Sequence, residues 1–349
     1  MKVPETMRAV VFRAGVSLDD PDAAGWVEMP VSAPEGYDLL VKVGAVAMNP
    51  VDTKLRGGRD AVLGFDAAGT VVAVGPFVTG FAPGDEIYYA GSILRPGSNA
   101  THQLVDARIV AAAPRSLGRA EAAALPLTVL TAWEALFDRL GIDPHGSHAG
   151  KSLLIIGGAG GVGSIAIQLA KRAGLRVVAT ASRKESEEWC RSLGADACVN
   201  HAADLAPQMA AAGFPEVDCI ANFNRTDEYW KTMGDLIAPQ GKVVLIVEPT
   251  GELALGGEFK RKSAVIAWEF MFTRPMFETA DIARQGWILA EVAGMVDRGE
   301  IRSTLAECLG AVSPGRLIEG HRRILTGRTM GKLVLDGWES QESDVSPTN

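Results

Sequence analysis

The chain has 349 residues, 47% hydrophobic and 22% charged, which is the composition of an ordinary globular protein and enough chain for two domains. Its net charge of −8 argues against general nucleic-acid binding, which needs basic surface to neutralise phosphates. There is no 18-residue apolar run and no apolar signal core near the N-terminus, so we expect no membrane span, no export and a cytoplasmic location.

The first third predicts a mainly β domain. Short apolar stretches such as Leu39–Val43 and Ala68–Val74 alternate with turn signals at Pro34–Gly36 and Pro83–Asp85. Closely spaced short strands of this kind favour a barrel or a sandwich. From Arg119 the composition becomes helical, and we expect helices over Ala120–Leu125 and Ala132–Leu140.

The middle of the chain predicts a parallel sheet, because strand and helix patterns alternate there. The expected strands are Leu153–Ile156, Val177–Ala181, Ala197–Asn200, Cys219–Asn222, Lys242–Val247 and Ala264–Trp268. After them we expect a long helix over Phe277–Arg298, an extended piece at Ser303–Leu309, a helix near Pro314–Leu325 and a last strand at Gly331–Leu335. The polar tail Ser340–Asn349 has no periodicity and is expected to be disordered.

A glycine motif follows the strand Leu153–Ile156. Gly158, Gly160 and Gly163 fit G-x-G-x-x-G, in which the first glycine turns the chain, the second admits a pyrophosphate and the third packs the next helix. The loop that would hold the phosphates comprises Gly158, Ala159, Gly160, Gly161, Val162 and Gly163. A glycine-rich turn without a ligand is the alternative, but the strand–loop–helix order favours a dinucleotide site.

The end of the second strand indicates which dinucleotide. An NAD site places a carboxylate there for the ribose 2′-hydroxyl. This chain has Ser182, Arg183 and Lys184, with no carboxylate before Glu185. A hydroxyl and two cations suit a 2′-phosphate, so we expect NADPH/NADP in preference to NAD(H), with a solvated basic turn as the alternative.

The four cysteines, Cys190, Cys198, Cys219 and Cys308, form no C-x-x-C pair. They are expected to be free thiols, as in a reducing compartment.

The order of these parts resembles the medium-chain dehydrogenase/reductase superfamily, in particular its quinone oxidoreductase-like members and a bacterial "zinc-type alcohol dehydrogenase-like" subgroup. The motifs that carry the resemblance are Asn49–Asp52, Leu63–Gly69, Pro83–Asp85, Leu130–Trp133, the glycine loop and Met330–Leu335. It implies an α/β fold class: a GroES-like catalytic domain from residues 1–126 and 302–349, and a Rossmann NADP(H)-binding domain, 127–301, with the active site between them. It also implies a homodimer that pairs through Ala264–Trp268.

Zinc is not expected, despite the subgroup's label. Zinc-dependent relatives bind the catalytic ion with a cysteine, a histidine and a second cysteine. By the motifs of the resemblance, these positions are Asn49, Phe65 and Leu127 here. A phenyl ring and an isobutyl group cannot ligate a metal.

Without a metal, the substrate's own chemistry must help to stabilise the charge that hydride transfer creates. Quinones and α,β-unsaturated carbonyls fit, because their reduced forms delocalise that charge. We therefore expect a zinc-independent quinone or enone reductase. Reduction of small aldehydes or ketones, and an NADPH-binding sensor with little turnover, remain open.

The resemblance also implies roles for single residues. Asn49 would lie at the nicotinamide and the substrate, Thr131 would contact the cofactor, and Asp52 would fix the loop. Lys54 stands where relatives often have a tyrosine, so Tyr89 is the candidate proton donor, with simple packing as its alternative.

Further cofactor contacts are expected at strand ends and in the last motif. By the resemblance, His201 would flank the adenosine ribose, with a surface histidine as the alternative. The others are Asn222 and Phe223 after the fourth strand, Val247 after the fifth, and Lys332. The segment Trp268–Arg274 would form either an apolar substrate wall or part of the dimer core.

Overall fold

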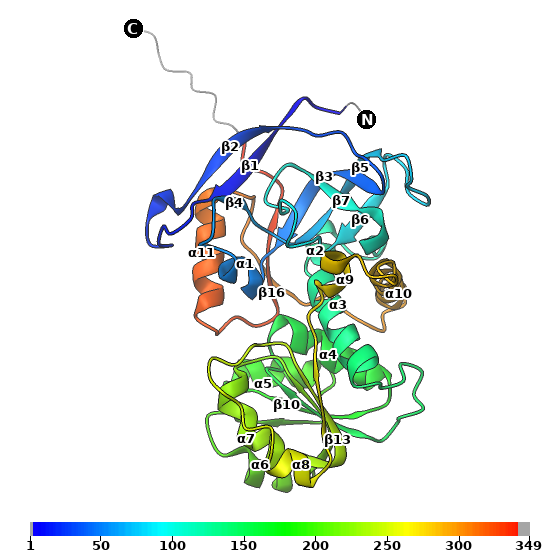
Figure 1. Ribbon diagram of the computed structural model, residues 1–349, viewed down its shortest axis with the longest axis vertical. Coiled ribbons are helices and arrows are strands. Elements are labelled where there is room, and N and C mark those ends of the chain that lie inside the picture. The colour runs from blue at the N-terminus through cyan, green and yellow to red at the C-terminus, as the bar shows by residue number, and fades with distance from the viewer. Residues whose placement is uncertain (1–2, 341–349) are drawn as a thin grey trace.

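Two halves stack along the long axis of the computed structural model, which describes residues 3–340 (Figure 1). The upper half in this view is mainly antiparallel β-structure, and the lower half is a parallel sheet covered by helices. The predicted fold class, a β-rich part joined to a doubly wound sheet, is confirmed. The predicted tail lies almost wholly outside the described residues, and the proposed domain boundaries stay a prediction.

The β-rich half centres on β3 (Asp38–Ala47), which pairs with β5 (Asp66–Val74), β7 (His102–Asp106) and β16 (Lys332–Asp336). Strand β16 comes from the far end of the chain, and its Val334 lies opposite Ala47. The remaining strands are β1 (Thr6–Phe12), β2 (Ala24–Pro30), β4 (Ala61–Val62), β6 (Glu86–Tyr89), β8 (Val110–Ala112) and β15 (Leu305–Cys308). Both chain ends therefore build one half.

The parallel sheet has the order β11-β10-β9-β12-β13-β14, the order of a dinucleotide-binding fold. Its strands are β9 (Ser152–Ile156), β10 (Arg176–Thr180), β11 (Ala197–Val199), β12 (Val217–Asn222), β13 (Ile237–Leu245) and β14 (Val265–Trp268). Strand β13 begins five residues before the predicted start, because Ile237 already pairs with Val217, ahead of a break in register near Gln240, which has a positive φ.

Every residue of β9 is buried, and successive side chains pack into different hydrophobic clusters on the two faces of the sheet. Leu153 and Ile155 join the cluster that contains α3 (Pro126–Trp133), α4 (Gly161–Arg172) and α10 (Arg284–Asp297). Leu154 and Ile156 face the cluster under α6 (Leu205–Ala211) and α7 (Thr226–Leu236). Burial on both faces explains the unbroken apolar run from which this strand was predicted.

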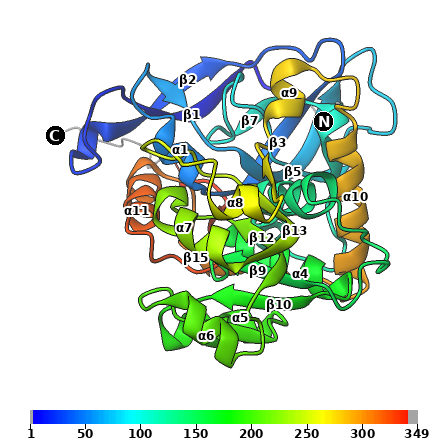
Figure 2. The same cartoon turned by 60° about the horizontal axis from the view of Figure 1, so that its bottom comes forward.

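The other helices are short or peripheral. Figures 1 and 2 both place α11 (Pro314–Leu325) and α10 on opposite sides of the molecule. The remaining helical segments are η1 (Pro21–Ala23), α1 (Pro50–Lys54), η2 (Ala107–Ile109), α2 (Arg119–Ala123), the π-helical η3 (Glu134–Arg139), α5 (Lys184–Ser192), α8 (Glu258–Arg261) and α9 (Thr273–Phe277).

The long helix predicted over 277–298 is wrong at its beginning. Glu278 takes a left-handed conformation, with φ of 43°, and ends α9. The chain then turns, with Asp281 held by Arg274 (Nε to Oδ2, 3.0 Å), before α10 begins at Arg284. Two helices with a turn between them replace the single one.

One helical stretch, Arg119–Arg139, is long and apolar enough to cross a membrane, although it contains no unbroken apolar run of 18 residues. In this structure 83% of its apolar window is buried inside the protein. It lies between the two halves as a core helix.

Candidate active site

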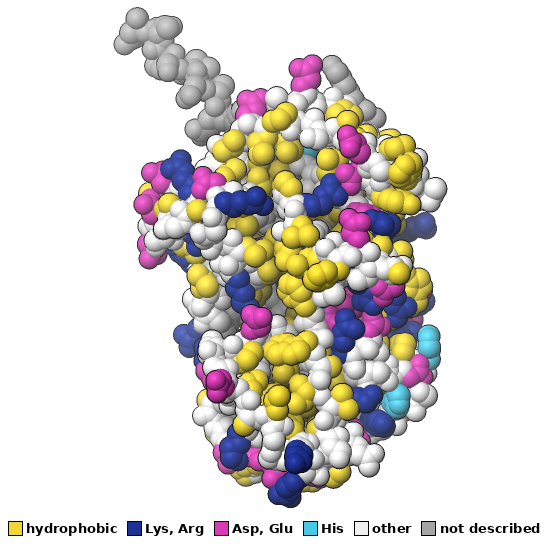
Figure 3. Space-filling view, in the orientation of Figure 1, with side chains coloured by type: hydrophobic (Ala, Val, Ile, Leu, Met, Phe, Trp, Pro, Cys, Tyr) yellow, Lys and Arg dark blue, Asp and Glu magenta, His cyan; other side chains and the backbone are white. Residues whose placement is uncertain are grey.

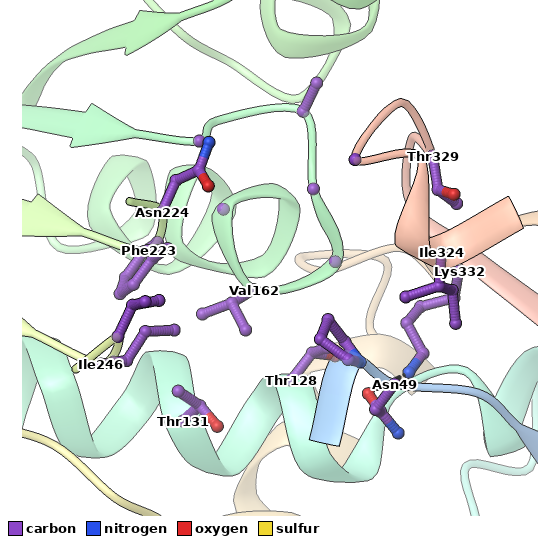
Figure 4. A pocket seen from close by; sticks show the side chains of 18 of the residues that line it. Asn49, Thr128, Thr131, Val162, Phe223, Asn224, Ile246, Ile324, Thr329 and Lys332 are labelled. Carbon is purple, nitrogen blue, oxygen red and sulfur yellow. Dashed lines mark hydrogen bonds between the residues drawn. The ribbon is translucent and has the colours of Figure 1, made fainter. Parts of the chain in front are cut away.

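A cleft of about 580 Å³ opens between the two halves. Side chains from both halves line it: Asn49 and Lys332 from the β-rich half lie close to each other, while Val162, Phe223 and Asn224 approach from the parallel sheet (Figure 4). Thr131 reaches it from α3. The cleft brings together most of the predicted site residues: Asn49, Thr131, Ala159, Gly160, Gly161, Val162, Gly163, Ser182, Arg183, His201, Phe223, Val247 and Lys332.

The glycine loop forms the turn between β9 and α4. Gly157, not Gly158, takes the positive φ of 86° and turns the chain, and its N–H donates to Thr180 Oγ1 at 2.9 Å. A Cβ on Gly158 would lie 2.7 Å from the Cβ of Ala179, and one on Gly163 would lie 2.3 Å from the Gly157 carbonyl oxygen. Gly158 is therefore needed for packing behind the loop and does not line the cleft. The loop leaves the start of α4 open to an anion.

Cations gather where β10 ends. Arg183 lines the cleft, and its Nη2 donates to the Arg328 carbonyl oxygen at 2.7 Å. Arg225 and Arg328 also line this end, and burial together with the charge of Arg225 lowers the pKa of His201. Lys184 instead points into solvent near Glu188, outside the cleft.

Arg225 and Arg328 were missed by the sequence analysis. Arg225 directly follows the strand-end residues Asn222–Asn224, so the strand-end argument could have included it. Arg328 comes from the loop before β16, whose approach to β10 nothing in the local sequence indicates. Asn222 is fully buried, and its Oδ1 accepts from the Asn224 N–H at 3.1 Å. It shapes the turn that presents Phe223 and does not line the cleft.

The other end of the cleft contains a buried polar network around Asn49. Lys332 Nζ donates to the Met48 carbonyl oxygen at 2.8 Å, to Asn49 Oδ1 and to Asp66 Oδ2 at 2.9 Å. Asn49 Nδ2 also donates to Asp66 Oδ2, at 2.8 Å. The other Asp66 oxygen accepts from the Leu127 N–H at 2.7 Å, at the beginning of α3. All of these side chains except Leu127 are no more than 3% exposed.

Asp52 supports this network from behind. Its Oδ2 accepts from the Asn49 N–H at 2.6 Å, which caps α1, while Oδ1 has no partner among the described residues. Burial raises the pKa of Asp52 to about 7. Asp52 does not line the cleft, so the geometry favours its loop-fixing role over direct contact with a ligand.

Tyr89, the predicted proton donor, lies outside the cleft. Its hydroxyl donates to Gln103 Oε1 at 2.8 Å inside the β-rich core, and burial raises the pKa of the phenol. The packing alternative describes Tyr89 better. Tyr88 is likewise buried, with its hydroxyl donating to the Leu289 carbonyl oxygen at 2.6 Å.

A second buried acidic group, Glu269, lines the cleft just after β14. Glu269 Oε2 accepts from Arg139 Nε at 2.8 Å, and Arg274 Nη1 lies 2.8 Å from Glu134 Oε2. Burial and the neighbouring Glu134 raise the pKa of Glu269 to about 9. Among the described residues that line the cleft, Glu269 is the one acidic side chain.

Comparisons with known proteins match the whole architecture. Residues 35–119 match the family model described as alcohol dehydrogenase GroES-like domain, and residues 161–269 match that described as zinc-binding dehydrogenase. The chain is 43% identical to a zinc-type alcohol dehydrogenase-like protein of Staphylococcus aureus, over 95% of this chain and 100% of the relative. It is 30% identical to a 2-methylene-furan-3-one reductase of Solanum lycopersicum, over 96% and 80%.

Two solved structures share this architecture. A putative zinc-dependent alcohol dehydrogenase from Rhizobium etli is 46% identical, with a TM-score of 0.91 over 96% of this chain and 99% of the other. The quinone oxidoreductase from Coxiella burnetii is 26% identical, with a TM-score of 0.76 over 95% and 99%.

The zinc in these names does not fit the residues around Asn49. Phe65 packs edge-on against Phe272, with ring centroids 5.3 Å apart, and Leu127 offers only its backbone N–H. Within residues 3–340, no three His, Cys, Asp or Glu side chains come together as a metal site. The acceptor beside Asn49, Asp66, is already paired with an ammonium group, which repels a metal cation.

Proposed function

Because the chain is an oxidoreductase of the medium-chain dehydrogenase/reductase superfamily, close to its zinc-type alcohol dehydrogenase-like members, we propose that it is an NADPH-dependent, zinc-independent reductase of quinones or α,β-unsaturated carbonyls. The observation that carries the proposal is one continuous cleft that is lined by the glycine loop, by the cations Arg183, Arg225 and Arg328 and by Asn49.

The cofactor proposal rests on charge. The glycine loop and the beginning of α4 suit a pyrophosphate. Ser182 and Arg183, together with Arg225 and Arg328, suit a ribose 2′-phosphate, and the described lining has no carboxylate at this end that would favour a 2′-hydroxyl. When bound, NADPH supplies the hydride.

The substrate proposal rests on what the rest of the cleft offers. Val247, Met271 and Phe272 provide apolar surface, and Asn49 provides a hydrogen-bond donor. A flat, conjugated acceptor needs little more, because its reduced form delocalises the new charge. The names of the tomato reductase and the Coxiella oxidoreductase point to the same chemical class.

A homodimer is part of the proposal. Strand β14 is an edge of the parallel sheet, and Val265 and Trp268 on it are 49% and 48% exposed. Figure 3 shows apolar side chains gathered down the middle of the face that carries α9 and this edge. An exposed apolar edge strand is suited to pairing with a second copy.

The test follows NADPH and NADH consumption by the purified, metal-depleted protein with a quinone, a cyclic enone, a saturated ketone and a small aldehyde. We expect turnover with the quinone or the enone, a preference for NADPH and no gain on adding zinc. Turnover with only the ketone or the aldehyde would replace the proposal by carbonyl reduction. Tight NADPH binding without turnover on any acceptor would favour a sensor.

A further inference from the structure

We infer that Lys332, paired with Asp66, is a positioning residue that locks the side-chain amide of Asn49 so that it offers the substrate oxygen only an N–H donor. This inference rests on the proposed reduction. Lys332 was predicted as a cofactor contact, but its ammonium group points away from the glycine loop into the network around Asn49 (Figure 4).

The orientation of the amide follows from the chemistry of its neighbours. An ammonium group only donates hydrogen bonds, and a carboxylate paired with it only accepts. Asn49 must therefore turn Oδ1 to Lys332 and Nδ2 to Asp66, and the reverse orientation would lose both bonds. A neutral pair in their place would accept either orientation.

The lock leaves one weakly held hydrogen-bond donor for a ligand. All three Nζ hydrogens of Lys332 have acceptors, and both Asp66 oxygens have donors. Asn49 Nδ2 carries a second hydrogen, whose protein acceptor is the Ala47 carbonyl oxygen at a long 3.4 Å. Asn49 lines the cleft, so a substrate oxygen that replaces this long contact would accept from the N–H.

The charge also acts on the amide. A cation on Oδ1 draws electron density from the amide and strengthens its N–H as a donor, and a site that is 2–3% exposed screens this effect little. Lys332 is joined to the cofactor loop as well, because the Gly331 N–H donates to the Ala159 carbonyl oxygen at 2.9 Å. The neighbouring residues Gly331 and Lys332, at the start of β16, thus connect the glycine loop to the Asn49 site.

The test is a double-mutant cycle between Asn49→Ala and the paired change Lys332→Met/Asp66→Asn, which removes both charges and leaves no lone buried ion. We expect the paired change to lower kcat with the quinone by about 100-fold, near the loss of one preorganised donor. NADPH affinity, measured by nicotinamide fluorescence, should stay within about threefold, less than the tenfold that 1.4 kcal/mol represents. In the Asn49→Ala background, the paired change should lower kcat no further.

Independent losses that multiply in the triple variant would overturn the inference, as would a folded paired variant with wild-type kcat or with a parallel loss of NADPH affinity. If the methionine variant does not fold, Lys332→Gln/Asp66→Asn provides neutral hydrogen-bonding partners and the same expectation. Arg95→Met/Asp38→Asn, which removes a bidentate ion pair outside the cleft, controls for general destabilisation. A wild-type protein inactive on every acceptor would instead refute the proposed function, and with it the purpose of the lock.

Discussion

At the scale of single residues, Arg183 is the side chain on which cofactor choice depends most directly. It lines the cleft and is held there by its bond to the Arg328 carbonyl oxygen. We expect Arg183→Ala to weaken NADPH binding about tenfold, the loss of one charge-assisted hydrogen bond, and to leave NADH binding unchanged. Titration of each nicotinamide by fluorescence measures both affinities.

Arg191→Ala is the matched control, because Arg191 lies on α5, the helix that Arg183 precedes, in an exposed ion pair with Glu187 outside the cleft. It should change neither affinity. Equal weakening of NADPH and NADH by Arg183→Ala would contradict recognition of a 2′-phosphate and indicate a disturbed loop.

Residue roles were predictable where local sequence determines them. The glycine loop, Ser182 and Arg183 follow strands whose ends meet the cleft, so their position could be derived from the strand pattern. The direction in which a side chain points could not be derived in this way. Tyr89 faces the β-rich core, and Lys332 faces Asp66, since contacts between β16 and the Asn49 loop span some 280 residues of sequence.

At the scale of elements, the parallel strands could be predicted from the sequence, but the breaks within elements could not. Alternation of strands and helices predicted all six parallel strands, because buried strands need continuous apolar runs. The turn between α9 and α10 escaped prediction, since it depends on a left-handed Glu278 and on the Arg274–Asp281 contact across the turn, which apolar periodicity does not report. The earlier start of β13 likewise depends on a partner elsewhere in the chain, Val217 of β12.

Matched substitutions on two different edge strands test the proposed dimer. Val265→Lys places a charge on β14, where Val265 is 49% exposed, and we expect it to separate the dimer into monomers. Val27→Lys makes the same change on β2, an edge of the three-stranded sheet where Val27 is 43% exposed, and should leave the dimer intact. Light scattering coupled to size exclusion measures the mass against 36.8 kDa per chain. A monomeric wild-type protein would rule out this interface.

At the scale of the whole molecule, buried ionisable groups determine how stability depends on pH. Asp52 and Glu269 have raised pKa values in the folded state, about 7 and about 9, so they bind protons more readily folded than unfolded. Their contribution to stability is present in acid and is lost as pH rises through those values. His321 acts in the opposite sense, because burial and the nearby Arg56 lower its pKa from 6.5 to about 3.

His321 is fully buried on α11, stacked on Phe12 with ring centroids 4.6 Å apart, and neither ring nitrogen has a partner among the described residues. Below pH 6.5 the unfolded chain protonates this histidine and the folded chain does not, so stability is lost as pH falls toward 3. Each pH unit over which only the unfolded chain is protonated lowers the free energy of unfolding by about 1.4 kcal/mol.

Replacement of His321 by phenylalanine keeps an aromatic ring against Phe12 and removes the proton site. Between pH 7 and pH 4.5 the wild-type protein should lose about 2–3 kcal/mol more stability than His321→Phe, because the imbalance acts over about two pH units. Urea unfolding at the two pH values measures this difference, and the carboxyl contributions cancel because both proteins share them. Parallel acid profiles would mean that the folded protein protonates His321 near its ordinary pKa, through opening of the contact between α11 and β1 that buries the ring.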